Sequence, residues 1–142
     1  MFTASYSIMS RAIRHLTGEP CSHVALECDG WVVHSNLLGV RVDSLKEFSS
    51  HSQIRYSVPI PMTTGTILSN YLEHRRAHYD FGALLYLGLR VIPVVGHLLP
   101  KKNLWQSSGM YLCTEWATSV IDGKTDSMIT PYQLYLRLES AK

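Results

Sequence analysis

The strongest constraint on the fold is the stretch CSHVALECDGWVVHS, residues 21–35, in which two valine-containing segments flank Asp29-Gly30. An Asp-Gly pair between alternating apolar residues is typical of a two-residue β-hairpin turn, because both turn positions need positive φ. The sequence therefore predicts two antiparallel strands, at residues 22–28 and 31–35.

This hairpin register decides which side chains share a face. Successive side chains point to opposite faces of a strand, so one face carries Cys21, His23, Ala25, Glu27, Val32, His34 and Asn36. His23 and His34 are then diagonal neighbours across the ladder, about 7–8 Å apart at the backbone and within side-chain reach. The opposite face carries Cys28 with Val24, Leu26, Trp31 and Val33.

The same register argues against a zinc site. Cys21, His23, Cys28 and His34 are zinc-ligand types, but a tetrahedral site needs all of them to converge, and Cys28 points to the other face. We therefore expect Cys28 to be a small buried hydrophobe. We also expect the protein to need no metal or cofactor.

The remaining patterns predict a single α+β domain over residues 1–142. This length suffices for one buried core. Apolar periodicity and capping residues predict helices at 6–16, at 44–48 after Asp43 or Ser44, from Thr63 or Thr64 through Leu72, at 81–89 after Asp80, at 113–121 and at 131–138. Two further strands are expected at residues 39–42 and 53–60, with Pro59 ending the second.

Composition narrows the class of partner and compartment. The net charge of +2 is too small to indicate a nucleic-acid partner. Three cysteines without a repeating spacing favour a reducing compartment. The first residues contain no uninterrupted apolar segment of the kind that secretory signals have, so we expect a cytoplasmic protein.

The most apolar tract, residues 81–100, is about long enough to cross a bilayer, but Arg90, Pro93 and His97 interrupt it. We expect a buried helix followed by a strand or loop; a surface that touches a membrane is the alternative. The overlapping segment 96–109 has the composition of a mobile loop that could cover a site.

A candidate nucleophile lies in YLCTEWATSVI, residues 111–121. Cys113 opens a predicted helix, and a thiol in the first turn is near the positive end of the helix dipole. An imidazolium beside it would lower the thiol pKa further. A base and the group that orients it are the usual partners of such a thiol, and His23 with His34 supplies that pair. Glu115 is expected to be a helix-start acid.

Together these segments resemble a known group of enzymes. S-H-V at 22–24, V-V-H-S at 32–35 and L-C-T-E-W at 112–116, in that order, resemble the circularly permuted papain-like cysteine hydrolases, relatives of the NlpC cell-wall peptidases and of lecithin:retinol acyltransferase. Ordinary papain-like enzymes have the cysteine before the histidine, whereas the permuted branch has the order seen here. Y-D-F-G-A-L-L at 79–85 and I-T-P-Y-Q-L-Y-L at 129–136 are also similar to this branch.

The resemblance implies a papain-like core, in which an antiparallel sheet packs against the helix that carries the cysteine. By position, Cys113 matches the nucleophile, His23 the base and His34 the third polar residue that orients the base. The backbone N–H of Cys113 would be one oxyanion donor. Tyr6 and Tyr111 are candidates for the second donor.

The expected function is hydrolysis of an amide or peptide bond, in a cell-wall peptide or a related compound, through a thioester on Cys113. The implied partners are a peptide, peptidoglycan-like or acyl substrate. One alternative is a membrane-associated acyltransferase or lipid esterase with the same three residues. Another is a catalytically silent structural or binding protein of a phage particle, virion-associated or released at lysis. The sequence leaves the oligomeric state open.

Overall fold

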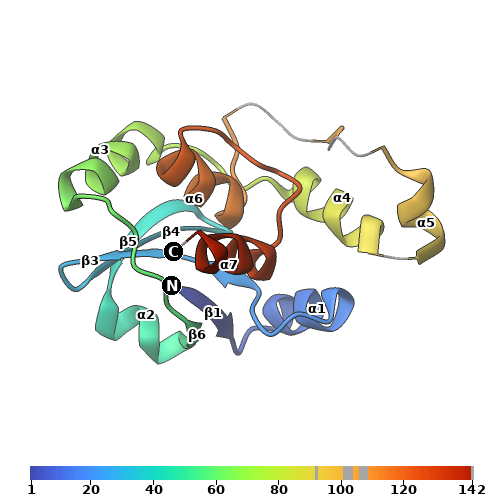
Figure 1. Ribbon diagram of the computed structural model, residues 1–142, viewed down its shortest axis with the longest axis horizontal. Coiled ribbons are helices and arrows are strands. Elements are labelled where there is room, and N and C mark those ends of the chain that lie inside the picture. Colours follow the sequence, from blue (N-terminus) through green and yellow to red (C-terminus); the bar gives the residue numbers. More distant parts are fainter. Residues whose placement is uncertain (92, 101–103, 106–108, 142) are drawn as a thin grey trace.

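The structure is a computed structural model that describes residues 1–91, 93–100, 104–105 and 109–141 (Figure 1). Its strands are β1 Phe2–Ser5, β2 His23–Val24, β3 Leu26–Cys28, β4 Trp31–Asn36, β5 Gly39–Ser44 and β6 Ser52–Tyr56. Its helices are α1 Ile8–Thr17, α2 Leu45–His51, α3 Thr64–His74, α4 Phe81–Val91, α5 Pro93–Leu98, α6 Cys113–Asp122 and α7 Pro131–Ser140.

The α+β class is confirmed, but the β-structure is divided between two small sheets. The strand orders are β2-β1-β6 and β3-β4-β5, and all the paired strands are antiparallel. Helix α6, which begins at Cys113, packs against β2 of one sheet and β4 of the other. The expected packing of antiparallel strands on this helix is therefore present, shared between two sheets.

The hairpin turn and its register are confirmed. Asp29 has φ 50° and Gly30 has φ 80°, as the two-residue turn requires. Cys28 pairs with Trp31, and Glu27 pairs with Val32. The face assignment holds for Cys28, Leu26 and Val33, which share one buried apolar cluster, whereas Val24 packs in a different cluster and Trp31 is exposed.

The expected strand at 22–28 is interrupted at Ala25. The N–H of Ala25 donates to the carbonyl oxygen of Met1 at 2.9 Å, so the chain leaves β4 at this residue. Residues His23 and Val24 pair instead with β1, a strand that the sequence analysis did not predict. The split places the two histidines on different sheets, so the expectation that they are diagonal neighbours across one ladder is wrong.

Two apolar clusters meet on α6. Trp116 and Val120 pack with the β3-β4-β5 sheet and Ile67 of α3. Cys113 and Ala117 pack with Phe2 and Val24 of the other sheet and Leu134 of α7. Trp116, Ala117 and Leu134 are fully buried. One short helix therefore contributes to the apolar cores of both sheets.

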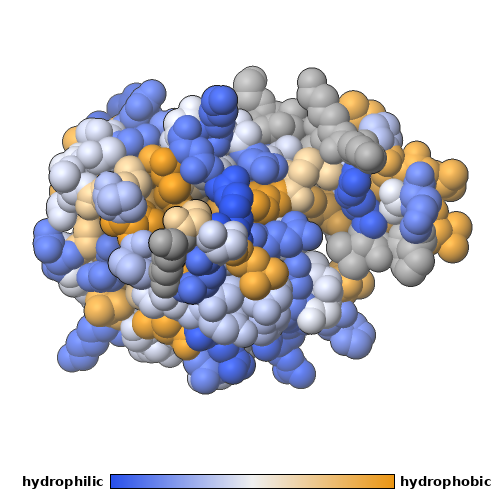
Figure 2. Space-filling model, in the orientation of Figure 1, coloured by the Kyte–Doolittle hydropathy of each residue, from blue (hydrophilic) through white to orange (hydrophobic). Residues whose placement is uncertain are grey.

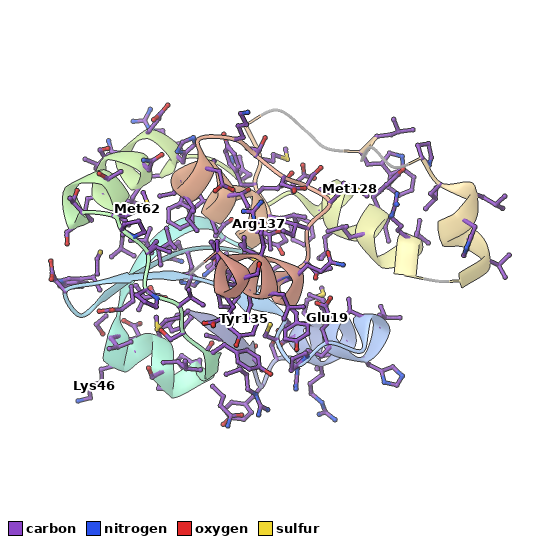
Figure 3. All side chains as sticks on the ribbon, viewed as in Figure 1. Glu19, Lys46, Met62, Met128, Tyr135 and Arg137 are labelled. Carbon is purple, nitrogen blue, oxygen red and sulfur yellow. The ribbon has the colours of Figure 1, made fainter. Side chains whose placement is uncertain are left out.

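Three helix starts follow the predicted caps Ser44, Thr63 and Asp80, and Thr130 caps α7 without having been predicted. Ser44, Thr63 and Thr130 each accept a hydrogen bond from the third residue of the helix that follows, and Asp80 Oδ1 accepts from Ala83 N at 2.8 Å. Two labelled side chains in Figure 3 fix α7: Glu19 Oε1 accepts from the Thr130 hydroxyl at 2.6 Å, and Tyr135 stacks on Tyr56 with 4.3 Å between ring centroids.

The apolar tract at 81–100 differs from the expectation. It forms two helices, α4 and α5, rather than a helix followed by a strand or loop, and much of it is exposed. Val94 and Leu98 of α5 are 75% and 82% exposed, and Figure 2 shows apolar side chains gathered over this end of the molecule. None of the helices in the described residues combines the length and hydropathy of a membrane-spanning segment. Of the segment 96–109, residues 101–103 and 106–108 lie outside the described residues.

A substitution at Gly39 tests how closely β5 approaches the segment that precedes α4. It has φ 100°, and a Cβ at this position would clash with the carbonyl oxygen of Ala77. We expect Gly39→Ala to lower the free energy of unfolding by about 3 kcal/mol, measured by urea titration. Gly30→Ala is the matched control, because Gly30 also has positive φ but open space around it; its loss should be about 1–2 kcal/mol. Equal losses of unfolding free energy in the two variants would contradict the close approach of Gly39 to the carbonyl oxygen of Ala77.

Candidate active site

The structure brings His23 and His34 into direct contact across the seam between the two sheets. Nε2 of His23 lies 2.9 Å from Nδ1 of His34, a hydrogen-bond distance, and the two rings are nearly perpendicular. His23 is positioned by the pairing of β2 with β1, and His34 by the centre of β4. The expected juxtaposition of the two histidines is therefore present.

Asp43 extends this pair, and the sequence analysis missed that role. Its Oδ2 lies 2.9 Å from Nε2 of His34. The sequence predicts a strand that ends at Val42, with Asp43 only as a possible helix cap. In the structure β5 continues through Ser44, and Val32 pairs with Asp43, so Asp43 shares the face of His34. Extending the β4–β5 ladder by two residues would have placed it there.

Phe48 of α2 covers the two imidazole rings. Its ring centroid lies 5.0 Å from that of His34 and 6.3 Å from that of His23. Ser44, the residue after Asp43, caps α2 and so directs this helix over the pair. His34 is consequently buried, whereas His23 keeps some exposure.

Cys113 is the first residue of α6 and lies next to β2. Backbone N–H groups of Val24 and Thr114 donate hydrogen bonds to its sulfur. Val24 directly follows His23, so the thiol lies against the strand that carries the candidate base. The Ser35 hydroxyl donates to the carbonyl oxygen of Tyr111 at 2.9 Å and thereby ties β4 to the segment that leads into α6.

The electrostatics differ from the expectation of a lowered thiol pKa. Burial raises the pKa of Cys113 to about 11, and this outweighs its backbone hydrogen bonds. Burial also lowers the pKa of His23 to about 3, and His34 adds to the effect. The pKa of His34 is lowered by burial, although Asp43 acts in the opposite direction. At neutral pH the site therefore holds a neutral thiol and two neutral imidazoles.

Glu115 caps the helix that carries Cys113. It is fully buried, and its Oε2 accepts from the backbone N–H of Leu112 at 2.7 Å, which confirms the expected helix-start role. Burial raises the pKa of this carboxyl to about 7, and Asp80 and Asp126 add to the effect. Oε1 of Glu115 has no hydrogen-bond partner within the part of the chain that the structure describes.

Two cavities adjoin these residues. One, of about 420 Å³, lies between α1 and α4 and is bordered by Cys113; its walls are almost entirely apolar. The other, of about 470 Å³, is bordered by His23, His34 and Asp43 and is more polar. Ser22 and Tyr79 line both cavities and so mark the place where they approach each other.

The two candidates for the second oxyanion donor do not line either cavity. Tyr6 is 73% exposed, and Tyr111 packs edge-on against His74 of α3 with 4.9 Å between ring centroids. Tyr79 is the tyrosine at the site. Burial raises its pKa, and the nearby Cys113 adds to the effect, so the hydroxyl stays protonated and able to donate.

Comparisons with known proteins found no match among family models, curated proteins or solved structures. Over the described residues, no group of three or more His, Cys, Asp or Glu side chains is placed to hold a metal ion.

Glu115 provides a pH-dependent test of the helix cap. A carboxyl whose folded-state pKa is raised stabilises the fold below its unfolded pKa, and this contribution is lost as pH rises through about 7. Glu115→Gln removes the titration while keeping an oxygen for Leu112 N–H. The difference in unfolding free energy, wild type minus variant, should fall by at most about 3 kcal/mol between pH 4 and pH 8.

The measurement is urea unfolding at several pH values. Glu47→Gln is the control, because Glu47 is the first-turn acid of α2 but is exposed. If the difference between wild type and the Glu115→Gln variant stays constant with pH, the buried carboxyl with a raised pKa is contradicted.

Proposed function

We propose that the protein is a cysteine hydrolase that forms a thioester on Cys113 with His23 as base and His34 as the residue that orients the base. The observation that carries this proposal is the 2.9 Å hydrogen bond between His23 and His34. His23 lies on β2, and the helix that begins at Cys113 packs against this strand. A base held by a second polar residue next to a thiol is the arrangement that nucleophilic acyl transfer uses.

The order of the proton transfers follows from the neutral state of both partners, the Cys113 thiol and the His23 imidazole. Nε2 of His23 is engaged with His34, so Nδ1 is the nitrogen left for the thiol. As Sγ of Cys113 attacks the carbonyl carbon, its proton passes to His23 Nδ1 and a C–S bond forms. His23 then gives the proton to the leaving amine or alkoxide as the C–N or C–O bond breaks. Water, deprotonated by His23, hydrolyses the thioester and regenerates the thiol.

The oxyanion of the tetrahedral intermediate needs hydrogen-bond donors at the junction of the two cavities. Tyr79 is suited to this role because it borders both cavities and keeps its proton. The resemblance to permuted papain-like hydrolases favours an amide or peptide substrate, such as a cell-wall peptide.

Trapping of the acyl-enzyme tests the nucleophile without a known substrate. p-Nitrophenyl acetate should give a burst of p-nitrophenolate, with an acetyl adduct on Cys113 found by peptide mass spectrometry. Cys113→Ala should abolish the burst, and His23→Ala should slow it by about 10²-fold or more, the usual size of a general-base contribution. Cys28→Ala is the matched control, because Cys28 is buried in the other apolar cluster. An unreactive Cys113 would contradict the proposal and favour the catalytically silent alternative.

The pH profile of this acylation tests the neutral resting state. With a base of pKa about 3 and a thiol of pKa about 11, both partners keep the required protonation from about pH 5 to pH 9. The rate, corrected for reagent hydrolysis, should be nearly constant over this range. A tenfold rise per pH unit up to a plateau near pH 8.5 would show an ordinary free thiol instead.

A second candidate, an acyltransferase or lipid esterase, is favoured by the cavity at Cys113. Its apolar walls come from Met9, Ile13 and Leu16 of α1 and from α4, so it suits an aliphatic acyl chain better than a peptide. The exposed apolar side chains of α5 lie in the segment that follows α4 and offer contact with a lipid surface.

Gly88 allows this second candidate to be tested. It lies on α4 at the cavity wall, and a side chain added there would meet open space. If the cavity holds the acyl chain, wild type should prefer p-nitrophenyl octanoate to the acetate, and Gly88→Phe should lower the octanoate rate by about tenfold. The acetate rate of the variant is the internal control and should not change. Equal effects on both esters, or none, would favour the amide and peptide reading.

A further inference from the structure

We propose that Asp43 is a positioning residue that fixes the tautomers of His34 and His23, so that His23 presents an unprotonated Nδ1 to Cys113. This inference rests on the proposed function for its catalytic consequence, but its structural content, the placement of two protons, is independent of any activity.

The first step is the hydrogen bond between Asp43 and His34. An ionised carboxylate offers only acceptor atoms. Its Oδ2 lies 2.9 Å from Nε2 of His34, so this nitrogen must carry the proton and donate it. Because burial keeps the ring neutral, the other nitrogen, Nδ1, is then a bare lone pair.

The second step transmits this choice to His23. Nδ1 of His34 can now only accept, and its 2.9 Å partner is Nε2 of His23. Nε2 of His23 therefore carries the proton of a ring that is also neutral. The remaining atom, Nδ1, is left unprotonated, which is the form that a general base needs. One carboxylate thus sets the proton positions on both rings.

The opposite arrangement shows what Asp43 excludes. If His34 carried its proton on Nδ1, it would donate to Nε2 of His23, and the His23 proton would move to Nδ1. The 2.9 Å contact between the rings would survive with donor and acceptor exchanged, but His23 could not accept the thiol proton. The distances alone permit either direction of hydrogen bonding between the two rings. Because the Asp43 carboxylate can only accept, it selects the direction that leaves Nδ1 of His23 unprotonated.

Other charges around His34 act on the ring differently. Arg41 pairs with His34 across the β4–β5 ladder and lowers its pKa, in the same direction as burial. His51 lines the same cavity. Arg41 therefore helps to keep the ring neutral, whereas Asp43 determines which nitrogen holds the single proton.

The test combines a direct reading of the protons with a rate. Long-range ¹H–¹⁵N correlation spectra of ¹⁵N-histidine-labelled protein distinguish the two neutral tautomers of each ring. In wild type both His23 and His34 should be Nε2-protonated. In Asp43→Asn, whose amide can either donate or accept, the rings should show a mixture or the reversed tautomers. The acylation rate of Cys113 by p-nitrophenyl acetate should fall by about tenfold or more, and Asp43→Glu should recover part of it.

Controls separate this role from a structural one. Asp122→Asn makes the same chemical change in an exposed ion pair with Arg137 and should alter neither readout. A wild-type His34 protonated on Nδ1 would overturn the proposal, and so would Asp43→Asn with unchanged tautomers or a rate within twofold of wild type. If wild-type Cys113 does not acylate at all, the proposed function fails, while the tautomers still decide the role of Asp43. If the variants do not fold, the wild-type spectra alone decide whether Asp43 has this role.

Discussion

The packing of α6 between the two sheets is the interaction on which the rest of the structure depends. Trp116 completes the core under the β3-β4-β5 sheet, and one turn earlier Cys113 completes the core under the β2-β1-β6 sheet. Because a small sheet needs a packed partner to be stable, the contacts of this helix with both sheets contribute to the burial that stabilises each. The candidate nucleophile is therefore placed by the same contacts that hold the domain together.

Burial affects the pKa of the Cys113 thiol more than the local features that would activate it. The first-turn position and the backbone hydrogen bonds to Cys113 favour a thiolate, but removal from water raises the thiol pKa to about 11. The same desolvation keeps His23 neutral. In the proposed reaction, charge would therefore develop only when a proton crosses from sulfur to imidazole, because the resting site holds a neutral thiol and a neutral imidazole.

Much of the site could be predicted from the sequence because it depends on short-range rules. The Asp29-Gly30 turn fixes the register of β3 and β4, and the sequence predicts correctly that His23 and His34 lie close together, although they meet across two sheets rather than on one ladder. Two features of the site could not be predicted from the sequence. The interruption at Ala25 depends on pairing with a strand 20 or more residues away, which local patterns do not encode. Asp43 escaped because its residue type also suits a helix cap, and only the full length of the β4–β5 ladder shows which role it takes. The thiol pKa depends on burial, a property of the whole fold.

The division of the expected strand at Ala25 has a mechanical consequence. His23 belongs to one sheet and His34 to the other, so the 2.9 Å bond between their rings spans the seam. The strength of a hydrogen bond falls steeply as its distance and angle depart from the optimum. A slight sliding or twisting of one sheet against the other would thus break this hydrogen bond while leaving each sheet intact. The contact between the two rings therefore depends on how the two sheets are aligned.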